Sequence, residues 1–376
     1  MKSILLTTTA LVAFAGAAVA DGHTGVSFSG AAELGYNDDT TSFGEDGFYW
    51  DAELGVNMAA ELDNGVAAGA AFTFAVVDGN NGNDATELEV DGDYVLSLTT
   101  EGAGLYFGDT EFAAKSLWKS AGDMEADAFS EADGETVIRG DVTVAGIKTS
   151  LSYRIADANG DLIGATTADD VDQLSIGVAG SAGMFNFTAA YQAEAETGAA
   201  GNVDFKEAET YGVSGSTSLS GATVSLGFAQ TSKFGTAAEK TSIGVQVAYP
   251  FGPVTATVYY VSEDVDGAEV DDNYGLTVAY AEGPLKASLK LRNEQGRDEW
   301  NIDGSYDLGN GMTILAGMLN ENEGDDNDYY VGGTYDLGGG AELLAVFAED
   351  KDADQKDEIG APEFMPGTTV VASFKF

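Results

Sequence analysis

The sequence lacks cysteine altogether and contains a single histidine among its 376 residues. The absence of cysteine excludes disulfides, thiol nucleophiles, iron–sulfur clusters and cysteine-ligated zinc. One histidine, His23, excludes histidine-rich metal sites and most His-based catalytic triads. Basic residues are also scarce, with 16 Lys and Arg against 63 Asp and Glu and a net charge of −47. Because such a chain repels polyphosphate, we expect no nucleic-acid partner.

A long apolar run is missing beyond the first twenty residues. These begin with Met1 and Lys2, continue through apolar residues and end in the A-x-A motif Ala18-Val19-Ala20. The pattern predicts a secretory signal peptide over residues 1–20. A membrane anchor is the alternative, but the apolar run is shorter than the ~18–20 residues that span a bilayer. We expect residues 21–376 to form one exported domain.

Helical periodicity is also absent from every long segment, apart from a short possibility within 111–134. Apolar and polar residues instead alternate, as in 185–192, 243–249 and 285–291, which predicts strands. Nine tight turns, each containing glycine, join pairs of these strands. They are 63–65, 101–102, 145–146, 181–183, 220–221, 250–253, 283–284, 309–311 and 338–340.

Longer acidic connections alternate with the tight turns, at 37–47, 157–172, 194–207, 263–272, 321–328 and 349–366. Nine hairpins plus a first and a last strand predict twenty antiparallel strands. Two architectures can hold so many antiparallel strands. One is a soluble sandwich, propeller or tandem array, and the other is a transmembrane barrel. Short turns alternating with long polar loops, and aromatic residues near strand ends, favour the all-β transmembrane barrel.

The last residues of the chain strengthen this interpretation. The alternation places Val370, Ala372, Phe374 and Phe376 on one face of a strand, and the last of them is an apolar aromatic residue. Phe374 and Phe376 are similar to the terminal signal by which outer-membrane barrels are recognised for assembly. We therefore expect the barrel-assembly machinery and outer-membrane lipid as partners.

The chain resembles the alphaproteobacterial, Rhodobacter-type general porins of the Gram-negative outer membrane. The similar residues are the opening strand 26–34, the stretch 104–109, the hairpin 330–340 and the ending Phe374-Lys375-Phe376. The resemblance implies a sixteen-stranded barrel that forms homotrimers, with a loop after the fifth strand folded into the lumen. The direct count of twenty strands differs from the sixteen of the family.

The predicted constriction loop covers residues 111–134, a stretch without strand alternation. Its apolar residues could pack against a wall, and the resemblance implies that its carboxylates line one side of the pore. An external loop with solvated acids is the alternative. The acidic residues are Glu111, Asp123, Glu125, Asp127, Glu131 and Asp133.

The opposing basic side is predicted from strand alternation. A charge that faces lipid at mid-depth costs about 2–4 kcal/mol, so basic residues within strands should face the lumen. In a soluble sandwich the same residues would form a solvated face. The basic residues concerned are Arg139, Lys148, Arg154, Lys286, Lys290 and Arg292.

Cofactor and catalytic signals are weak. No cofactor is expected, although acidic loop runs at 169–172, 271–272 and 325–328 leave loop-bound Ca²⁺ or Mg²⁺ open. The triplet Asp350, Asp352 and Asp354 has calcium-loop spacing but lacks the glycine and glutamate that an EF-hand requires. Because no G-x-S-x-G, Walker or complete dinucleotide motif is present, we expect no enzyme. An outer-membrane lipase or protease remains a weaker alternative.

The sequence thus predicts an outer-membrane porin for passive diffusion of small hydrophilic solutes and ions, with a weak preference for cations. The alternative is an acidic, cation-binding secreted or surface β protein that forms no channel. The two differ in where the basic strand residues lie, in a water-filled lumen or on an exterior face.

Overall fold

The computed structural model describes residues 25–39, 47–80, 83–84, 89–130, 136–155, 171–194, 208–233, 239–320, 327–351, 359–360 and 364–376. The predicted signal peptide lies outside these ranges. Among the described residues, no helix has the length and apolar content needed to cross a membrane. The elements are β1 (Gly25–Asn37), β2 (Gly47–Glu61), β3 (Ala67–Asn80), β4 (Asn83–Asp84), β5 (Glu89–Thr99), β6 (Ala103–Gly108), α1 (Ala113–Leu117), β7 (Val137–Val144), β8 (Ile147–Ile155), β9 (Val171–Ala182), β10 (Phe185–Glu194), β11 (Ala208–Leu219), β12 (Ala222–Lys233), β13 (Lys240–Phe251), β14 (Val254–Val265), β15 (Asn273–Glu282), β16 (Leu285–Glu294), β17 (Arg297–Gly309), β18 (Met312–Asn320), β19 (Asp328–Gly338), β20 (Ala341–Glu349) and β21 (Gly367–Lys375).

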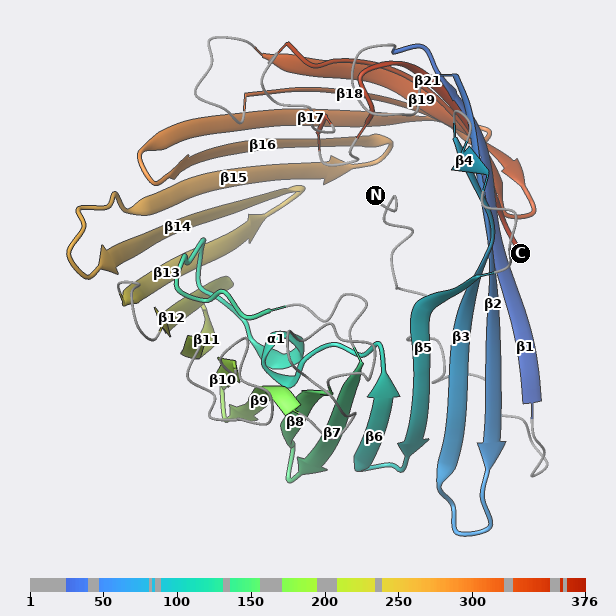
Figure 1. The fold of residues 1–376 in the computed structure, drawn as a ribbon. Helices are drawn as coiled ribbons and strands as arrows, with labels where there is room; N and C mark the ends of the chain where they lie inside the picture. The colour runs from blue at the N-terminus through green and yellow to red at the C-terminus, as the bar shows by residue number, and fades with distance from the viewer. Residues whose placement is uncertain are drawn as a thin grey trace.

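The strands form one closed antiparallel barrel (Figure 1). Each long strand pairs with the next along the chain, and β21 returns to pair with β1, where Ala32 lies opposite Phe374. The backbones of Gly30 and Phe376 exchange two hydrogen bonds at this closure, of 3.2 and 2.8 Å. The two-residue β4 pairs only with β3, so the wall has twenty strands. The predicted barrel class and strand count are confirmed, whereas the sixteen strands of the resemblance and the sandwich alternative are wrong.

All nine predicted tight turns join neighbouring strands. At Ala145-Gly146 both residues have positive φ, 53° and 80°, and Ser220-Gly221 has 52° and 90°. These values fit the two-residue turns whose twist matches that of the flanking strands. The predicted alternation of tight and long connections fails once, where Gln295-Gly296 joins β16 to β17 with φ of 49° and 83°. Glutamine is unusual at positive φ, so this pair was not predicted as a turn although it contains Gly296.

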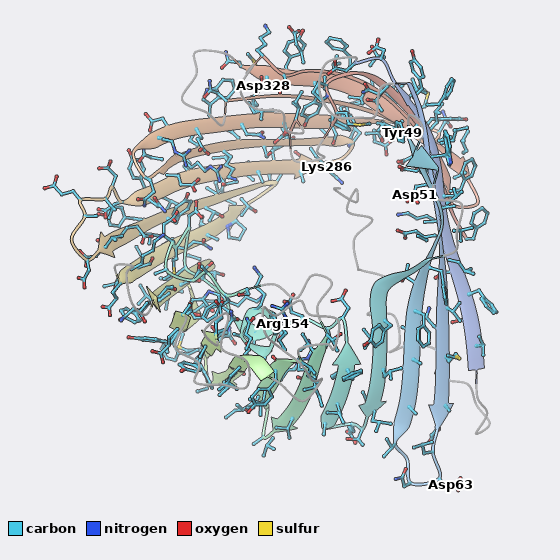
Figure 2. All side chains as sticks on the ribbon, in the orientation of Figure 1. Tyr49, Asp51, Asp63, Arg154, Lys286 and Asp328 are labelled. Carbon is cyan, nitrogen blue, oxygen red and sulfur yellow. The ribbon has the colours of Figure 1, made fainter. Side chains whose placement is uncertain are left out.

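The two faces of the wall differ as the alternation predicts. On β13 the side chain of Ile243 is 59% exposed on the outer face, while neighbouring Ser242 is fully buried on the inner face. Large apolar side chains are exposed on the outer face all around the described barrel, including Phe28 and Phe376. Figure 2 shows side chains on both faces of this wall. An apolar exterior is what a barrel in contact with lipid requires.

Candidate functional site

The segment after β6, residues 109–130, lies against the inner face of the barrel and is called the inner segment here. It contains α1 and no strand, and α1 contacts β8, β9 and β10. Figure 1 shows α1 within the ring of strands beside these three. The inner segment includes the described part of the stretch predicted to form the constriction loop.

Backbone amides attach the inner segment to the wall. Three of them donate hydrogen bonds to serine hydroxyls that project inward from three different strands and are fully buried. Buried amides need such partners, because an unpaired buried donor is costly. The pairs are Ala113 N to Ser152 Oγ (2.9 Å), Ala114 N to Ser175 Oγ (2.8 Å) and Ala126 N to Ser242 Oγ (2.9 Å).

Glycines of the wall allow this close approach. A Cβ atom at Gly177 would come within 2.2 Å of the Ala113 carbonyl oxygen, and one at Gly244 within 2.0 Å of the Ala121 oxygen. At Gly212 a Cβ atom would meet the ring of Trp118 at 2.5 Å. The seat of the inner segment therefore includes a strip of inward-facing glycines beside the serines. Sequence reasoning missed it, although glycine and serine at inward positions of successive strands were a usable signal.

Apolar packing completes the seat. The rings of Trp118 and Phe129 lie 5.5 Å apart between centroids and are both buried, together with Met124. Ala229 and Val261 of the wall join the same cluster. The apolar residues of this stretch thus face the wall instead of solvent.

The predicted acidic residues within the inner segment take different roles. The Trp118 indole donates a 2.8 Å hydrogen bond to the Asp127 carboxylate. Burial raises the pKa of this carboxyl, and the Trp118 hydrogen bond and the Lys115 charge offset part of that rise. Glu111 is exposed at the start of the segment. Glu131 and Asp133 lie outside the described residues.

Asp123 and Glu125 bind the wall through their backbones. The Glu125 amide donates to Glu263 Oε1 (3.1 Å), and the Asp123 carbonyl accepts a 3.0 Å hydrogen bond from Asn273. Both side chains are half-buried, on the part of the segment that reaches β14 and β15. The inner segment also carries Lys115 and Lys119, both exposed, which the prediction of an acidic face did not include.

The first predicted basic group lies at the root of the inner segment. Arg139 Nη1 donates to the Glu111 carbonyl oxygen at 2.6 Å, and the guanidinium sits 4.8 Å from the centroid of the Tyr106 ring. Arg139 and Lys148 both pair with Asp141, at 3.3 and 3.4 Å. Arg154 shares the inward side of β8 with Lys148, and Figure 2 shows it beside α1. The structure therefore brings Arg139 to the start of the segment, while Lys148 and Arg154 share the inner face of the neighbouring strand.

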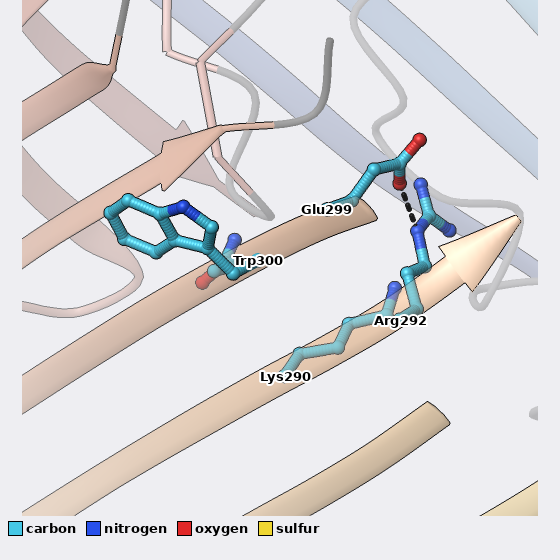
Figure 3. Close-up of a pocket in the computed structure, with 5 residues that line it drawn as sticks. Lys290, Arg292, Glu299 and Trp300 are labelled. Atoms are coloured by element: carbon cyan, nitrogen blue, oxygen red, sulfur yellow. Dashed lines mark hydrogen bonds and ion pairs between the residues drawn. The ribbon is translucent and has the colours of Figure 1, made fainter. Parts of the chain in front are cut away.

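The second basic group runs along β16. Lys286, Lys290 and Arg292 occupy inward positions, while Leu285 and Leu291 are exposed on the outer face. The Nε atom of Arg292 forms an ion pair with Glu299 of β17, and the Nη2 atom of Arg292 lies 3.6 Å from Glu294 Oε2. Figure 3 shows this pair with Lys290 beside it at a shallow hollow. The basic residues thus share their surface with carboxylates.

The described residues hold no group of three or more His, Asp or Glu side chains arranged for a metal ion. At the β14–β15 connection, Asp272 accepts hydrogen bonds from the Tyr260 hydroxyl and the Glu263 amide. The hydrogen bond from Tyr260 is the main cause that lowers the pKa of Asp272, and the hydrogen bond from the Glu263 amide adds to it. Asp352 and Asp354 of the calcium-like triplet, the run 169–170 and residues 325–326 lie outside the described ranges.

Comparison with known families identifies the class of protein that this closed barrel represents. The sequence model of the Gram-negative porin family matches residues 7–355. The chain therefore belongs to the Gram-negative porin family. This confirms, at the level of the family, the resemblance seen in the strands at the two ends of the chain.

Solved structures similar to the chain include porins of Rhodopseudomonas blastica. One multiply substituted form is 20% identical, with a TM-score of 0.48, over 75% of this chain and 98% of that one. A triple mutant of the same porin is 18% identical, with the same TM-score and coverage. A structure reported as "Asymmetric conductivity of engineered proteins" is 16% identical, with a TM-score of 0.44, over 94% of this chain and 100% of that one. Among curated proteins, no relative matches the sequence.

Family membership and the closed barrel define an outer-membrane channel protein. The alternative of a secreted β protein without a channel is set aside, because the family consists of channel proteins and the sheet has no open edge. Proteins of this family and fold are channels, not enzymes.

Proposed function

We propose that the protein is a passive diffusion channel for small hydrophilic solutes and ions, with the inner segment as its constriction. The observation that carries the proposal is the seat of this segment on the inner face of a closed barrel, held by wall serines and wall glycines. A porin needs no reactive group, only a wet lumen, a constriction and a field across it.

We further propose a weak preference for cations. The chain carries a net charge of −47, and Glu111, Asp123, Glu125 and Asp127 lie on the described inner segment. Acidic groups raise the local cation concentration, more so at low salt. Lys115 and Lys119 on the same segment oppose this, as do Lys286 and Lys290 on the inner face of β16, so the preference should be modest.

We propose that the terminal strand directs assembly into the outer membrane. The exposed rings of Phe374 and Phe376 lie on the lipid-facing side of the strand that closes the barrel, where a barrel-assembly machinery could recognise them. We propose a homotrimer in outer-membrane lipid as the working form. Loop-bound Ca²⁺ or Mg²⁺ stays a prediction, tested by comparing thermal unfolding with and without a chelator.

The test is conductance of the purified mature protein in a planar bilayer, with a salt gradient across it. We expect stepwise ohmic currents in groups of three and a reversal potential of the sign that indicates a small cation preference. Absence of conductance from correctly folded protein would overturn the channel proposal. Anion preference at low salt would overturn only the proposed selectivity.

A further inference from the structure

An apolar cluster lies on the inner face of the barrel, away from the inner segment. Its wall members are Leu319 of β18, Tyr330 of β19, and Val346 and Ala348 of β20, all at most 4% exposed. Inner positions of a porin-type barrel are normally polar, because they face water. An apolar patch there must be covered by something.

Strand register places this cluster on the same face as the charged residues of β16. Residues directly opposite each other in paired strands project to the same side of a sheet. One row of such partners runs across five strands. It consists of Ser288, Asp303, Gly317, Tyr330 and Ala348.

Side-chain contacts agree with that row. Asp303 accepts hydrogen bonds from the Ser288 hydroxyl (3.1 Å) and from the Tyr330 hydroxyl (2.7 Å). The Tyr330 ring reaches Asp303 by crossing Gly317, where a Cβ atom would lie 2.3 Å from the ring. Tyr330 therefore lies along the inner wall.

The cover comes from the connection between β20 and β21. Ile359 is 2% exposed and Phe364 is 7% exposed, and both pack on the wall members of the cluster. The Phe364 and Tyr330 rings lie 4.9 Å apart between centroids. Gly360, at a φ of 79°, passes so close that a Cβ atom would come within 2.5 Å of the Tyr330 ring. The Tyr330 ring is thus held between a glycine of the wall and a glycine of the connection.

These residues have a fixed local geometry. The backbones of Ile359 and Phe364 exchange two hydrogen bonds, of 2.8 and 3.0 Å. Where the connection returns to β21, Asn37 donates to the Pro366 carbonyl at 2.9 Å, and the Thr368 amide donates to Asp38 at 2.6 Å. We call Ile359, Gly360 and Phe364 the second inner element.

We infer that the second inner element is a second constriction, which narrows the lumen from the side facing the inner segment. The inner segment contacts strands from β7 to β15, and the second element contacts β18 to β20. Strands β16 and β17 separate the two on one side, and β21 to β6 on the other. A solute therefore passes between two inward elements, beside the charged residues of β16 and β17.

The strand number gives this arrangement a physical reason. Barrel diameter grows with the number of strands, and 16–18 strands already leave an aqueous channel. Twenty strands enclose a wider lumen, which one segment on one side would leave open. The inference rests on the proposed channel function.

The test compares unitary conductance and solute size limit for wild type and for Phe364→Ala. Removing the ring releases the second inner element from Tyr330, so conductance should rise by roughly 1.5-fold, since it follows the open cross-section of the pore. The limiting size of sugars that enter liposomes should rise with it. Phe347→Ala is the matched control, because this ring lies on the outer face of β20. Conductance in the control should equal that of wild type.

A second measurement keeps the inference testable if Phe364→Ala folds poorly. Because the chain has no cysteine, Ile359→Cys introduces a unique thiol. In folded protein this thiol should react with a water-soluble maleimide at least about tenfold more slowly than the exposed control Ala268→Cys, because protection follows burial and local opening.

The outcomes separate the inference from the proposed function. A wild-type protein that does not conduct contradicts the channel proposal itself. A conducting wild type whose conductance and size limit are unchanged by Phe364→Ala overturns only the second constriction. Equal labelling rates at positions 359 and 268 overturn it as well.

Discussion

The inner segment and the second inner element bind the inner wall of the barrel in different ways. Between β8 and β15, here the polar sector, the wall offers serine hydroxyls, glycines and the Glu263 carboxylate, and the inner segment binds largely through its own backbone. Between β18 and β20, here the apolar sector, the wall offers Leu319, Tyr330 and Val346, and the second element binds through side chains. A segment without regular structure must find partners for its amides on the wall, whereas Ile359 and Phe364 of the second element hydrogen-bond to each other.

The comparison predicts that the polar sector depends on hydroxyl groups. Replacing Ser152, Ser175 and Ser242 together by Ala leaves three buried amides without acceptors, each at about 1–3 kcal/mol. We expect the inner segment to leave its seat and trypsin to cleave folded protein at Lys115 and Lys119. Ser214→Ala, which removes a hydroxyl bonded only to Thr188 among the described contacts, is the control. Resistance of the triple variant equal to wild type would contradict the described seat.

A smaller effect is expected from filling the glycine strip. In Gly244→Ala the added methyl group meets the Ala121 carbonyl, and overpacking of this kind costs about 1–3 kcal/mol. Conductance should become noisier and larger on average, as measured in single-channel records. Gly140→Ala adds the same methyl group where no atom lies within 4 Å and should leave the records unchanged. Identical records for both variants would show that the segment tolerates displacement.

The buried Asp127 carboxyl should make the stability of the seat and the cation preference depend on pH. We expect no such dependence in the apolar sector. Because its folded-state pKa is raised by burial, the stability it lends to the seat is fully present below the ordinary aspartate pKa. That contribution is lost as the pH rises through the raised value. Lowering the pH should also neutralise Asp127 before an ordinary aspartate and so reduce cation preference early.

The Asp127→Asn variant checks this, with reversal potential measured across acidic pH. The amide retains an acceptor for Trp118 and cannot titrate. We expect the early part of the pH-dependent loss of selectivity to disappear, because the group that titrates early is gone. A pH profile that matches wild type would show that Asp127 does not cause the effect.

The smallest effect is expected between the two sectors, on β16. Arg292→Gln removes one positive charge and leaves Glu299 and Glu294 without their partner. Cation preference should increase slightly in the salt-gradient measurement, more at low salt, because screening weakens at low ionic strength. Arg297→Gln, at the exposed first residue of β17, is the control with the same change in net charge. An equal shift in both variants would mean that the net charge of the protein, not the position of Arg292 along β16, sets selectivity.

Much of the barrel could be predicted because its signals are local. Period-two alternation and glycine turns such as Ala145-Gly146 determine the number of strands and which side chains share a face. Neither requires knowledge of which strands pair. The Gln295-Gly296 turn was missed, since its left-handed glutamine depends on tertiary hydrogen bonds to Asp271 and Asn273. The placement of the site residues depends on pairings far apart in the chain. No local pattern links Arg139 to the Glu111 carbonyl, or Phe364 to Tyr330, so these contacts could not be derived from sequence alone.

The closure of β1 on β21 has a consequence for the order of folding. Asn37 and Thr369 are partners in the ladder and in a 2.8 Å side-chain hydrogen bond, although they are 332 residues apart in the chain. Contacts of such separation form slowly, because the intervening chain must first be organised. The first strand keeps an open edge until the last residues arrive, and exposed strand edges promote aggregation. The chain therefore needs protection during export, and synthesis must be complete before the ring can close.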